Sequence, residues 1–277
     1  TPVLAKGVET GREHTMSEPA LLVERDGHVV TLTLNRPEKR NAFNAPMIEE
    51  LSDAFETLSK NPECRLLLIR GAGTVFSAGA DLEWMKAASH YSERENEEDA
   101  YAMAQMLRQL FELPQITIAL LHGAAMAGAC GLAAAADIAI ARKGTIFSFS
   151  EVKLGIIPAT ISPYVINAIG PRWARMLFIT AERFEADFAA KIGLVHHEVE
   201  DDMAMEKLVE HYADLAYAAS PEAVADTKEL VSRVTGEIID ASLGHLTAKR
   251  LAHRRVSTLG KEGLAAFLEK RKPKWAR

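Results

Sequence analysis

Two apolar runs of this chain each end in a stretch of alanine, glycine and serine. The run CRLLLIRG (64–71) is followed by FSAGAD (76–81), and ITIALL (116–121) is followed by HGAAMAGACGL (122–132). Small residues after a buried strand let a ligand approach the backbone and leave N–H groups unblocked. A helix that begins just after such a turn directs further N–H groups, with a partial positive charge, at the same place. Two such turns that converge would form an oxyanion hole, although tight packing of a helix on a strand also requires glycine and alanine.

The apolar segment 116–141 has the length of a membrane span but not its composition. It contains His122 and Asp137, and its middle is alanine and glycine, which contribute little transfer free energy. A spanning helix needs about 20 strongly apolar residues. We therefore expect a strand, a glycine-rich turn, a tightly packed helix and a second strand here, and no membrane contact.

The chain divides into a β/α part and a helical part. Residues 20–37 have the pattern of a β-hairpin around Asp26-Gly27, and 46–60 and 101–113 are predicted as helices. The polar segment 90–99 is predicted as a mobile surface segment. After Ser162 helical periodicity dominates, over 163–169, 171–180, 186–191, 201–219, 221–234, 238–253 and 257–269. This order indicates an α/β part followed by helices.

Composition excludes several classes of protein. A chain of 277 residues, 48% of them hydrophobic, can bury a sizeable core, and its net charge of −6 argues against nucleic-acid binding. Cys64 and Cys130 lack metal-ligand spacing and are too few for a disulfide scaffold, which favours a reduced, cytoplasmic setting. No complete nucleotide loop and no metal-ligand set is found, so no metal and no cofactor are expected. Residues 1–18 are expected to be disordered or an extension outside the fold, without a secretory signal.

Five segments occur in the order and spacing of one known family. They are LNRPEKRNAFN (34–44), FSAGADLEWM (76–85), HGAAMAGACGLAAAADIAIA (122–141), FSFSEVKLGIIPATISPYVINAIG (147–170) and AERFEADFAAKIGLVHHEV (181–199). From about residue 20 to the C-terminus, the sequence resembles the crotonase (enoyl-CoA hydratase/isomerase) superfamily. The resemblance implies an α/β fold, with a repeated ββα spiral over 19–210 and a helical trimerisation region over 211–277. It also implies a homotrimer or a dimer of trimers.

The resemblance further implies an acyl-CoA site. The backbone N–H groups of Ala80 and Gly128 would hold the thioester oxygen, and each such donor is worth roughly 3–4 kcal/mol as charge develops on an enolate. Contacts with CoA are implied for Lys39, Ala42, Ala78, Asp81 and Leu82. The C-terminal helix of this family reaches the CoA of a neighbouring subunit, which implies contacts from Phe267 and Lys270.

Many hydratases of this family have two catalytic glutamates, and only one has a counterpart here. The first position is Gly131, and the second is Glu151, whose apolar neighbours would raise its pKa toward a useful range for acid–base catalysis. We expect a lyase that hydrates an α,β-unsaturated acyl-CoA. A single base also suits a Δ3-Δ2 isomerase, and a non-catalytic acyl-CoA-binding or RNA-binding homologue is a third interpretation.

The sequence also carries a hint of substrate. GADLEWMK (79–86), SEVKLGIIPATISPYV (150–165) and AERFEADFA (181–189) most resemble bacterial hydratases for branched glutaconyl-CoA esters, such as methylglutaconyl-CoA hydratase. Such substrates have a distal carboxylate. Lys86 is a candidate cation for it, and a solvated helix lysine is the alternative interpretation.

Overall fold

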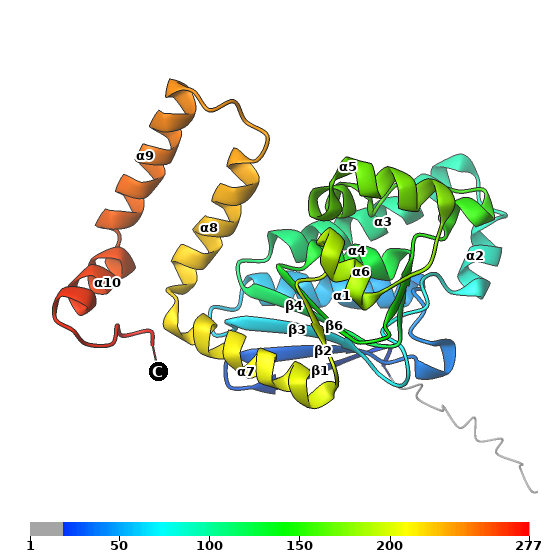
Figure 1. Cartoon of the computed structure of the whole chain (residues 1–277), viewed down its shortest axis with the longest axis horizontal. Helices are drawn as coiled ribbons and strands as arrows, with labels where there is room; N and C mark the ends of the chain where they lie inside the picture. The colour runs from blue at the N-terminus through cyan, green and yellow to red at the C-terminus, as the bar shows by residue number, and fades with distance from the viewer. Residues whose placement is uncertain (1–18, 277) are drawn as a thin grey trace, which may run out of the picture.

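The computed structural model describes residues 19–276 and has an α/β body with a helical arm beside it (Figure 1). The main sheet has the order β1-β2-β3-β4-β6-β9. β1 and β2 are antiparallel, as the predicted hairpin requires, and the other neighbours are parallel. The strands are β1 (Leu21–Asp26), β2 (Val29–Leu34), β3 (Leu66–Gly71), β4 (Ile116–Leu121), β6 (Ile138–Arg142) and β9 (His197–Val199).

A second, smaller sheet has the order β5-β7-β8. Its strands are β5 (Ala124–Met126), β7 (Ile146–Ser148) and β8 (Phe184–Glu185). The main strands β4 and β6 are each followed within a few residues by a strand of the small sheet, β5 and β7, and then by a helix. This β-β-α repetition confirms the predicted fold class.

Helices cover both faces of the main sheet, because successive side chains of a strand point to opposite sides. Leu67 and Ile69 of β3 belong to the larger core, which also contains side chains of α1 (Ala45–Ser59), α3 (Glu93–Glu112), α4 (Gly128–Ala135) and α5 (Ser162–Thr180). Leu66 and Leu68 belong to the second core with α7 (Asp202–Ala218), which Figure 1 shows on the other side of the sheet. The body also contains α2 (Leu82–Ala88), α6 (Ala186–Ile192) and two short 3-10 turns, η1 (Pro37–Lys39) and η2 (Glu151–Leu154).

The segment 90–99 lies at the surface, as predicted, but most of it is helical. Helix α3 begins at Glu93, inside that segment, and Ser92 and Glu95 form a capping box in which each side chain accepts from the other's backbone N–H. Acidic residues in the first turn are also favoured by the helix dipole. The acidic residues of this segment therefore belong to the N-terminal part of α3.

Two other local predictions are confirmed. The segment 116–141 forms β4, β5, α4 and most of β6, and no helix between residues 19 and 276 is long and apolar enough to cross a membrane. Helix α5 is interrupted at Gly170, where φ is 75° just before Pro171, so it follows the predicted helices 163–169 and 171–180.

The C-terminal arm consists of α8 (Pro221–Val234), α9 (Ala241–Val256) and α10 (Thr258–Leu268), and Figure 1 shows α9 and α10 on the side of α8 that is away from the body. Ala266 is the one hydrophobic residue of these three helices that is buried. Polar contacts hold the middle of α8 against the body, where Lys228 Nζ lies 2.7 Å from Asp137 Oδ2 and 2.9 Å from Gln115 O. The predicted boundary at 210/211 falls inside α7, and that division of the chain stays a prediction. The predicted extension 1–18 lies outside the described residues.

Candidate functional site

The first small-residue turn is held in an extended conformation against Phe43. Phe43 N donates to Gly79 O (2.7 Å), and Asp81 N donates to Phe43 O (2.8 Å). Both bonds leave the strand on the side of Phe43, so the N–H of the residue between them, Ala80, points to the opposite side. Within the described part of the chain, the Ala80 N–H donates no hydrogen bond.

The second turn lies directly against the first. Ser77 N donates to Ala124 O and Met126 N donates to Ser77 O, each at 3.1 Å. Gly79 has a φ of 92°, and a Cβ built on it would be 3.1 Å from Met126 O. Glycine is needed there for its conformation and for the close approach of the other turn. The two turns predicted to converge therefore do so.

Gly128 is the first residue of α4, so its N–H has no acceptor within the helix. The residue before it, Ala127, has φ 50° and ψ −115°, a conformation that non-glycine residues rarely adopt. Its backbone is fixed by a bond from Ala127 N to Ser148 O (2.9 Å). Among residues 19–276, the Gly128 N–H donates to no backbone acceptor. Both predicted oxyanion donors are thus available to a ligand.

Glu151 is brought to the same place by strand β7. It follows Ser148 by three residues and is the first residue of η2, and Lys153 of this turn donates to Ala181 O (2.8 Å). Glu151 is only 9% exposed, and its Oε2 atom has no hydrogen-bond partner among residues 19–276. Burial raises the pKa of Glu151, opposed in part by its own backbone N–H.

Cys130, on helix α4, is near enough to Glu151 to respond to its charge. Burial raises the pKa of its thiol, and the nearby charge of Glu151 raises it further. Cys130 Sγ donates to Ala125 O at 3.1 Å, so the thiol faces the strand that leads into the second turn. The geometric link to Gly128 is the bond from Ala127 N to Ser148 O, because Ala127 precedes Gly128 and Ser148 lies three residues before Glu151.

Position 131, where the first family glutamate is absent, has no room for a side chain. A Cβ built on Gly131 would lie 2.4 Å from Ile161 Cγ2 and 3.4 Å from Leu107 Cδ1. Ile161 is itself 1% exposed. An apolar side chain thus fills the space beside Gly131, and within the described chain Glu151 is the sole buried carboxylic acid of this part of the site.

The residues predicted to contact CoA differ in their exposure to solvent. Lys39 and Leu82 are exposed, Ala78 is half-buried and Ala42 is buried, all on the two segments that flank the first turn. Asp81 is buried, and its carboxylate is bonded to Arg36 and to Glu83 N. Phe267 and Lys270 are exposed at the end of α10, which Figure 1 shows far from α4 in the same chain.

Sequence reasoning missed Arg36, Ile161 and Cys130 as parts of this site. Arg36 lies in a segment with several charges, so nothing distinguished it as the partner of Asp81. Ile161, the N-cap residue of α5, lies against Gly131 from 30 residues along the chain, and no local pattern marks such a contact.

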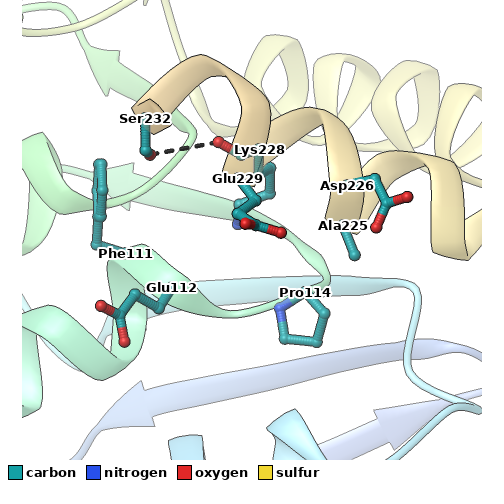
Figure 2. A pocket seen from close by; sticks show the side chains of 8 residues that line it. All are labelled: Phe111, Glu112, Pro114, Ala225, Asp226, Lys228, Glu229 and Ser232. Atoms are coloured by element: carbon teal, nitrogen blue, oxygen red, sulfur yellow. Dashed lines mark hydrogen bonds between the residues drawn. The ribbon is translucent and has the colours of Figure 1, made fainter. Parts of the chain in front are cut away.

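A cavity of about 380 Å³ lies elsewhere, between the end of α3 and α8 (Figure 2). None of its lining residues is a predicted site residue. Its acidic rim is already neutralised, because Arg108 pairs with Glu112, Arg250 with Glu229 and Arg254 with Asp226. We assign no ligand to it. The lining residues are Phe111, Glu112, Pro114, Ala225, Asp226, Lys228, Glu229 and Ser232.

Comparison with known proteins decides the family. A family model described as enoyl-CoA hydratase/isomerase matches residues 24–277. The chain belongs to this family. A putative enoyl-CoA hydratase of Thermus thermophilus is 31% identical over 249 residues, which cover 90% of this chain and 98% of that protein.

Solved structures of the family agree with the fold. A putative enoyl-CoA hydratase/isomerase (crotonase) from Legionella pneumophila has a TM-score of 0.87 and 44% identity, covering 94% of this chain and 100% of the other. An enoyl-CoA hydratase from Shewanella pealeana has a TM-score of 0.89 and 40% identity, covering 92% and 96%. The chain is therefore an enzyme of the hydratase/isomerase family with a crotonase fold.

Proposed function

We propose that this enzyme adds water to an α,β-unsaturated acyl-CoA through an enolate held by two backbone N–H groups. The Ala80 and Gly128 N–H groups bind the thioester oxygen and stabilise the negative charge that develops on it. Glu151 takes a proton from the attacking water, whose oxygen bonds to C3. The protonated Glu151 then returns that proton to C2. Atoms and charge balance with a single carboxylate.

The observation that carries the proposal is the state of Glu151. A carboxylate that is nine-tenths buried and has an unpartnered oxygen costs free energy in the absence of a ligand. A water or a substrate hydrogen at Oε2 would satisfy it. The raised pKa suits a group that must both accept and return a proton near neutral pH.

The second candidate is a Δ3-Δ2 isomerase that uses the same site. The packing of Ile161 against Gly131 favours it, because no second carboxylate is available there to hold a water. In that reaction Glu151 would move one proton between C2 and C4. A non-catalytic acyl-CoA-binding or RNA-binding role is the third candidate, and the net charge of −6 gives no support to RNA.

Contacts with the rest of the substrate are part of the proposal. Lys39, Ala42, Ala78, Asp81 and Leu82 belong to the segments that flank the Ala80 turn, so we propose this side for CoA, with Asp81 acting through its backbone because its carboxylate is engaged. For a branched glutaconyl ester, Lys86 in the last turn of α2 is the candidate partner of the distal carboxylate.

The experiment that tests the function is turnover of crotonyl-, methylglutaconyl- and 3-enoyl-CoA in D₂O and in H₂¹⁸O, with products identified by mass. Hydration places deuterium at C2 and ¹⁸O at C3. Movement of the double bond without uptake of ¹⁸O would replace the hydratase by the isomerase. Binding without turnover of any substrate would favour the non-catalytic role.

We predict that the protein assembles as a trimer or a dimer of trimers. The arm exposes large apolar side chains, including Ile238, Ile239 and Phe267 at 81%, 94% and 81% exposure. A monomer would leave this surface in water, which is unfavourable. In the assembly we propose that Phe267 and Lys270 contact the CoA of a neighbouring subunit. Light scattering at micromolar concentration measures the mass, and a monomer would contradict the prediction.

We also predict that activity needs neither a metal nor NAD. Two N–H groups and one carboxylate supply the charge stabilisation and the proton transfer that the reaction requires. Activity should therefore be unchanged after treatment with a chelator and gel filtration. Complete loss, restored by a divalent cation, would be inconsistent with this mechanism. Cys64 and Cys130 are free and buried, in keeping with the cytoplasmic setting that we propose.

A further inference from the structure

A buried ion pair lies beside the Ala80 turn. Arg36 Nη2 is 2.7 Å from Asp81 Oδ2, and the two side chains are only 17% and 6% exposed. Arg36 Nη1 also donates to Ala42 O at 2.6 Å. The other Asp81 oxygen, Oδ1, accepts from Glu83 N at 2.8 Å and caps helix α2. Both carboxylate oxygens are thus engaged within the protein.

The segment that carries Arg36 is itself rigidly held. Asn41 is fully buried, and its Oδ1 accepts from Arg36 N at 2.9 Å. Its Nδ2 donates to Ala72 O (2.7 Å) and Val75 O (2.9 Å), in the loop that leads into the Ala80 turn. An amide that makes three hydrogen bonds to backbone groups fixes segment 36–43 against that loop.

The ion pair closes a ladder whose centre is Ala80. The bonds of Phe43 to Gly79 and to Asp81 determine the direction of the Ala80 N–H, as described above. Arg36 holds the residue before Phe43, Ala42, and the residue after Ala80, Asp81. One guanidinium therefore joins both strands of the ladder at the point where the oxyanion donor is presented. The planar fork of arginine can hold two acceptors at once, which lysine cannot do in the same geometry.

We propose that the Arg36–Asp81 ion pair positions the Ala80 N–H for catalysis and does not bind the substrate. The inference rests on the proposed role of Ala80 in holding the thioester oxygen. Burial by itself would raise the pKa of Asp81, but the hydrogen bonds and charge of Arg36 and the backbone N–H of Glu83 outweigh it and lower the pKa. The pair is therefore ionised at neutral pH.

The test uses Asp81→Asn and Arg36→Lys with a saturated acyl-CoA labelled with ¹³C at the thioester carbonyl. Infrared difference spectra at saturation report how strongly the bound carbonyl is polarised, whatever the affinity. In the natural enzyme the carbonyl stretch should move to lower frequency than in water. In both variants the shift should be smaller than in the natural enzyme. Arg36→Lys should differ less from the natural enzyme than Asp81→Asn does, because lysine keeps the positive charge but cannot hold both acceptors.

We expect kcat to fall in the same variants in which the carbonyl shift is reduced. A donor misplaced by about 1 Å can cost roughly 10²-fold in rate, so kcat should fall by up to that factor while the Kd for the saturated acyl-CoA changes little. If Asp81→Asn does not fold, Arg36→Lys decides the matter. A higher Kd with an unchanged carbonyl stretch would overturn the proposal and make the Asp81 side chain a CoA contact.

Asp137→Asn is the matched control. The Lys228–Asp137 pair has the same 2.7 Å separation and side-chain exposures of 19% and 28%, and it lies at the amino ends of β4 and β6, away from both turns. The Asp137→Asn substitution should lower the melting temperature without changing the carbonyl stretch of the bound acyl-CoA. A normal shift in the natural enzyme with no change in the two variants would overturn the role of the ion pair alone. No shift in the natural enzyme would overturn the oxyanion site as well.

Discussion

Replacing Glu151 by glutamine will lower kcat by at least about 10²-fold, since general acid–base catalysis contributes typically about 10²–10⁴-fold. Glutamine keeps the size of the side chain and one acceptor atom but cannot take up a proton. The Kd for a saturated acyl-CoA should change little, because the thioester oxygen is held by backbone groups. Steady-state kinetics and calorimetry measure the two quantities. Full activity of the variant would show that another group does the chemistry, and His122, at the end of β4, would be examined first.

The same substitution should stabilise the fold. Burial raises the pKa of Glu151 in the folded state above its value in the unfolded chain. The folded state therefore favours the protonated form, and this contribution is fully present below the ordinary glutamate pKa of about 4.3 and is lost as the pH rises through the folded pKa. Above the ordinary glutamate pKa, a buried Glu151 that favours the protonated form opposes folding, and glutamine removes that cost.

Thermal melts across pH measure this effect. Glu151→Gln should have a higher melting temperature than the natural enzyme at pH 7 and above, and the gain should disappear toward pH 4. Glu182→Gln, at an exposed position, is the control and should change neither stability nor kcat. If Glu151 instead stabilised the fold, the Glu151→Gln variant would have a lower melting temperature than the natural enzyme at neutral pH. The acid limb of kcat/KM in the natural enzyme should also lie above the ordinary glutamate range.

Much of the fold could be predicted because its signals are local. The hairpin around Gly27 needs a positive φ, here 57°, and the sequence offers Asp-Gly between two β-rich runs. The break in α5 needs Gly170 followed by Pro171, which are adjacent in the sequence. Each of these features depends on residues within one turn, so the chain can be interpreted there without its tertiary partners.

The elements that were missed depend on distant partners. Strand β8 has two residues, and β5 and β9 have three each, so none of them has a periodicity of its own. They form because β7 pairs with both β5 and β8, and β6 pairs with β9. The start of α3 was missed for another reason, because a capping box and a solvated acidic segment share the same composition.

The candidate site shows the same division. The sequence marks the two small-residue turns after the apolar runs of β3 and β4, which contain Ala80 and Gly128, and Glu151 among its apolar neighbours. What the sequence could not give is the set of contacts that hold them. Arg36 and Asp81 are 45 positions apart, and their pairing depends on how segment 36–43 lies along the Ala80 turn. Chemistry that acts through backbone N–H groups leaves few side chains to recognise, so its supporting residues appear only in three dimensions.

Gly128→Pro should lower kcat by about 10²–10³-fold, the usual cost of removing one oxyanion donor. Gly128 is the first residue of α4, where proline is well tolerated because the N–H has no partner in the helix. The fall in kcat should therefore come more from the lost N–H than from the proline ring. The residue before a proline is conformationally restricted, however, and Ala127 already has an unusual backbone. Circular dichroism and a thermal melt must accompany the kinetics.

Gly128→Ala separates the N–H from the side chain. A Cβ at this position would lie 2.8 Å from Met103 Cε, the flexible end of a methionine, and 3.6 Å from the ring of Phe43. Alanine keeps the N–H, so its cost should be limited to the movement of Met103. The ratio of the two kcat values then measures the donor itself. Equal activity of folded alanine and proline variants would show that the oxyanion is held by another turn, whereas a proline variant that loses at least about 10²-fold relative to alanine identifies Gly128 as the donor.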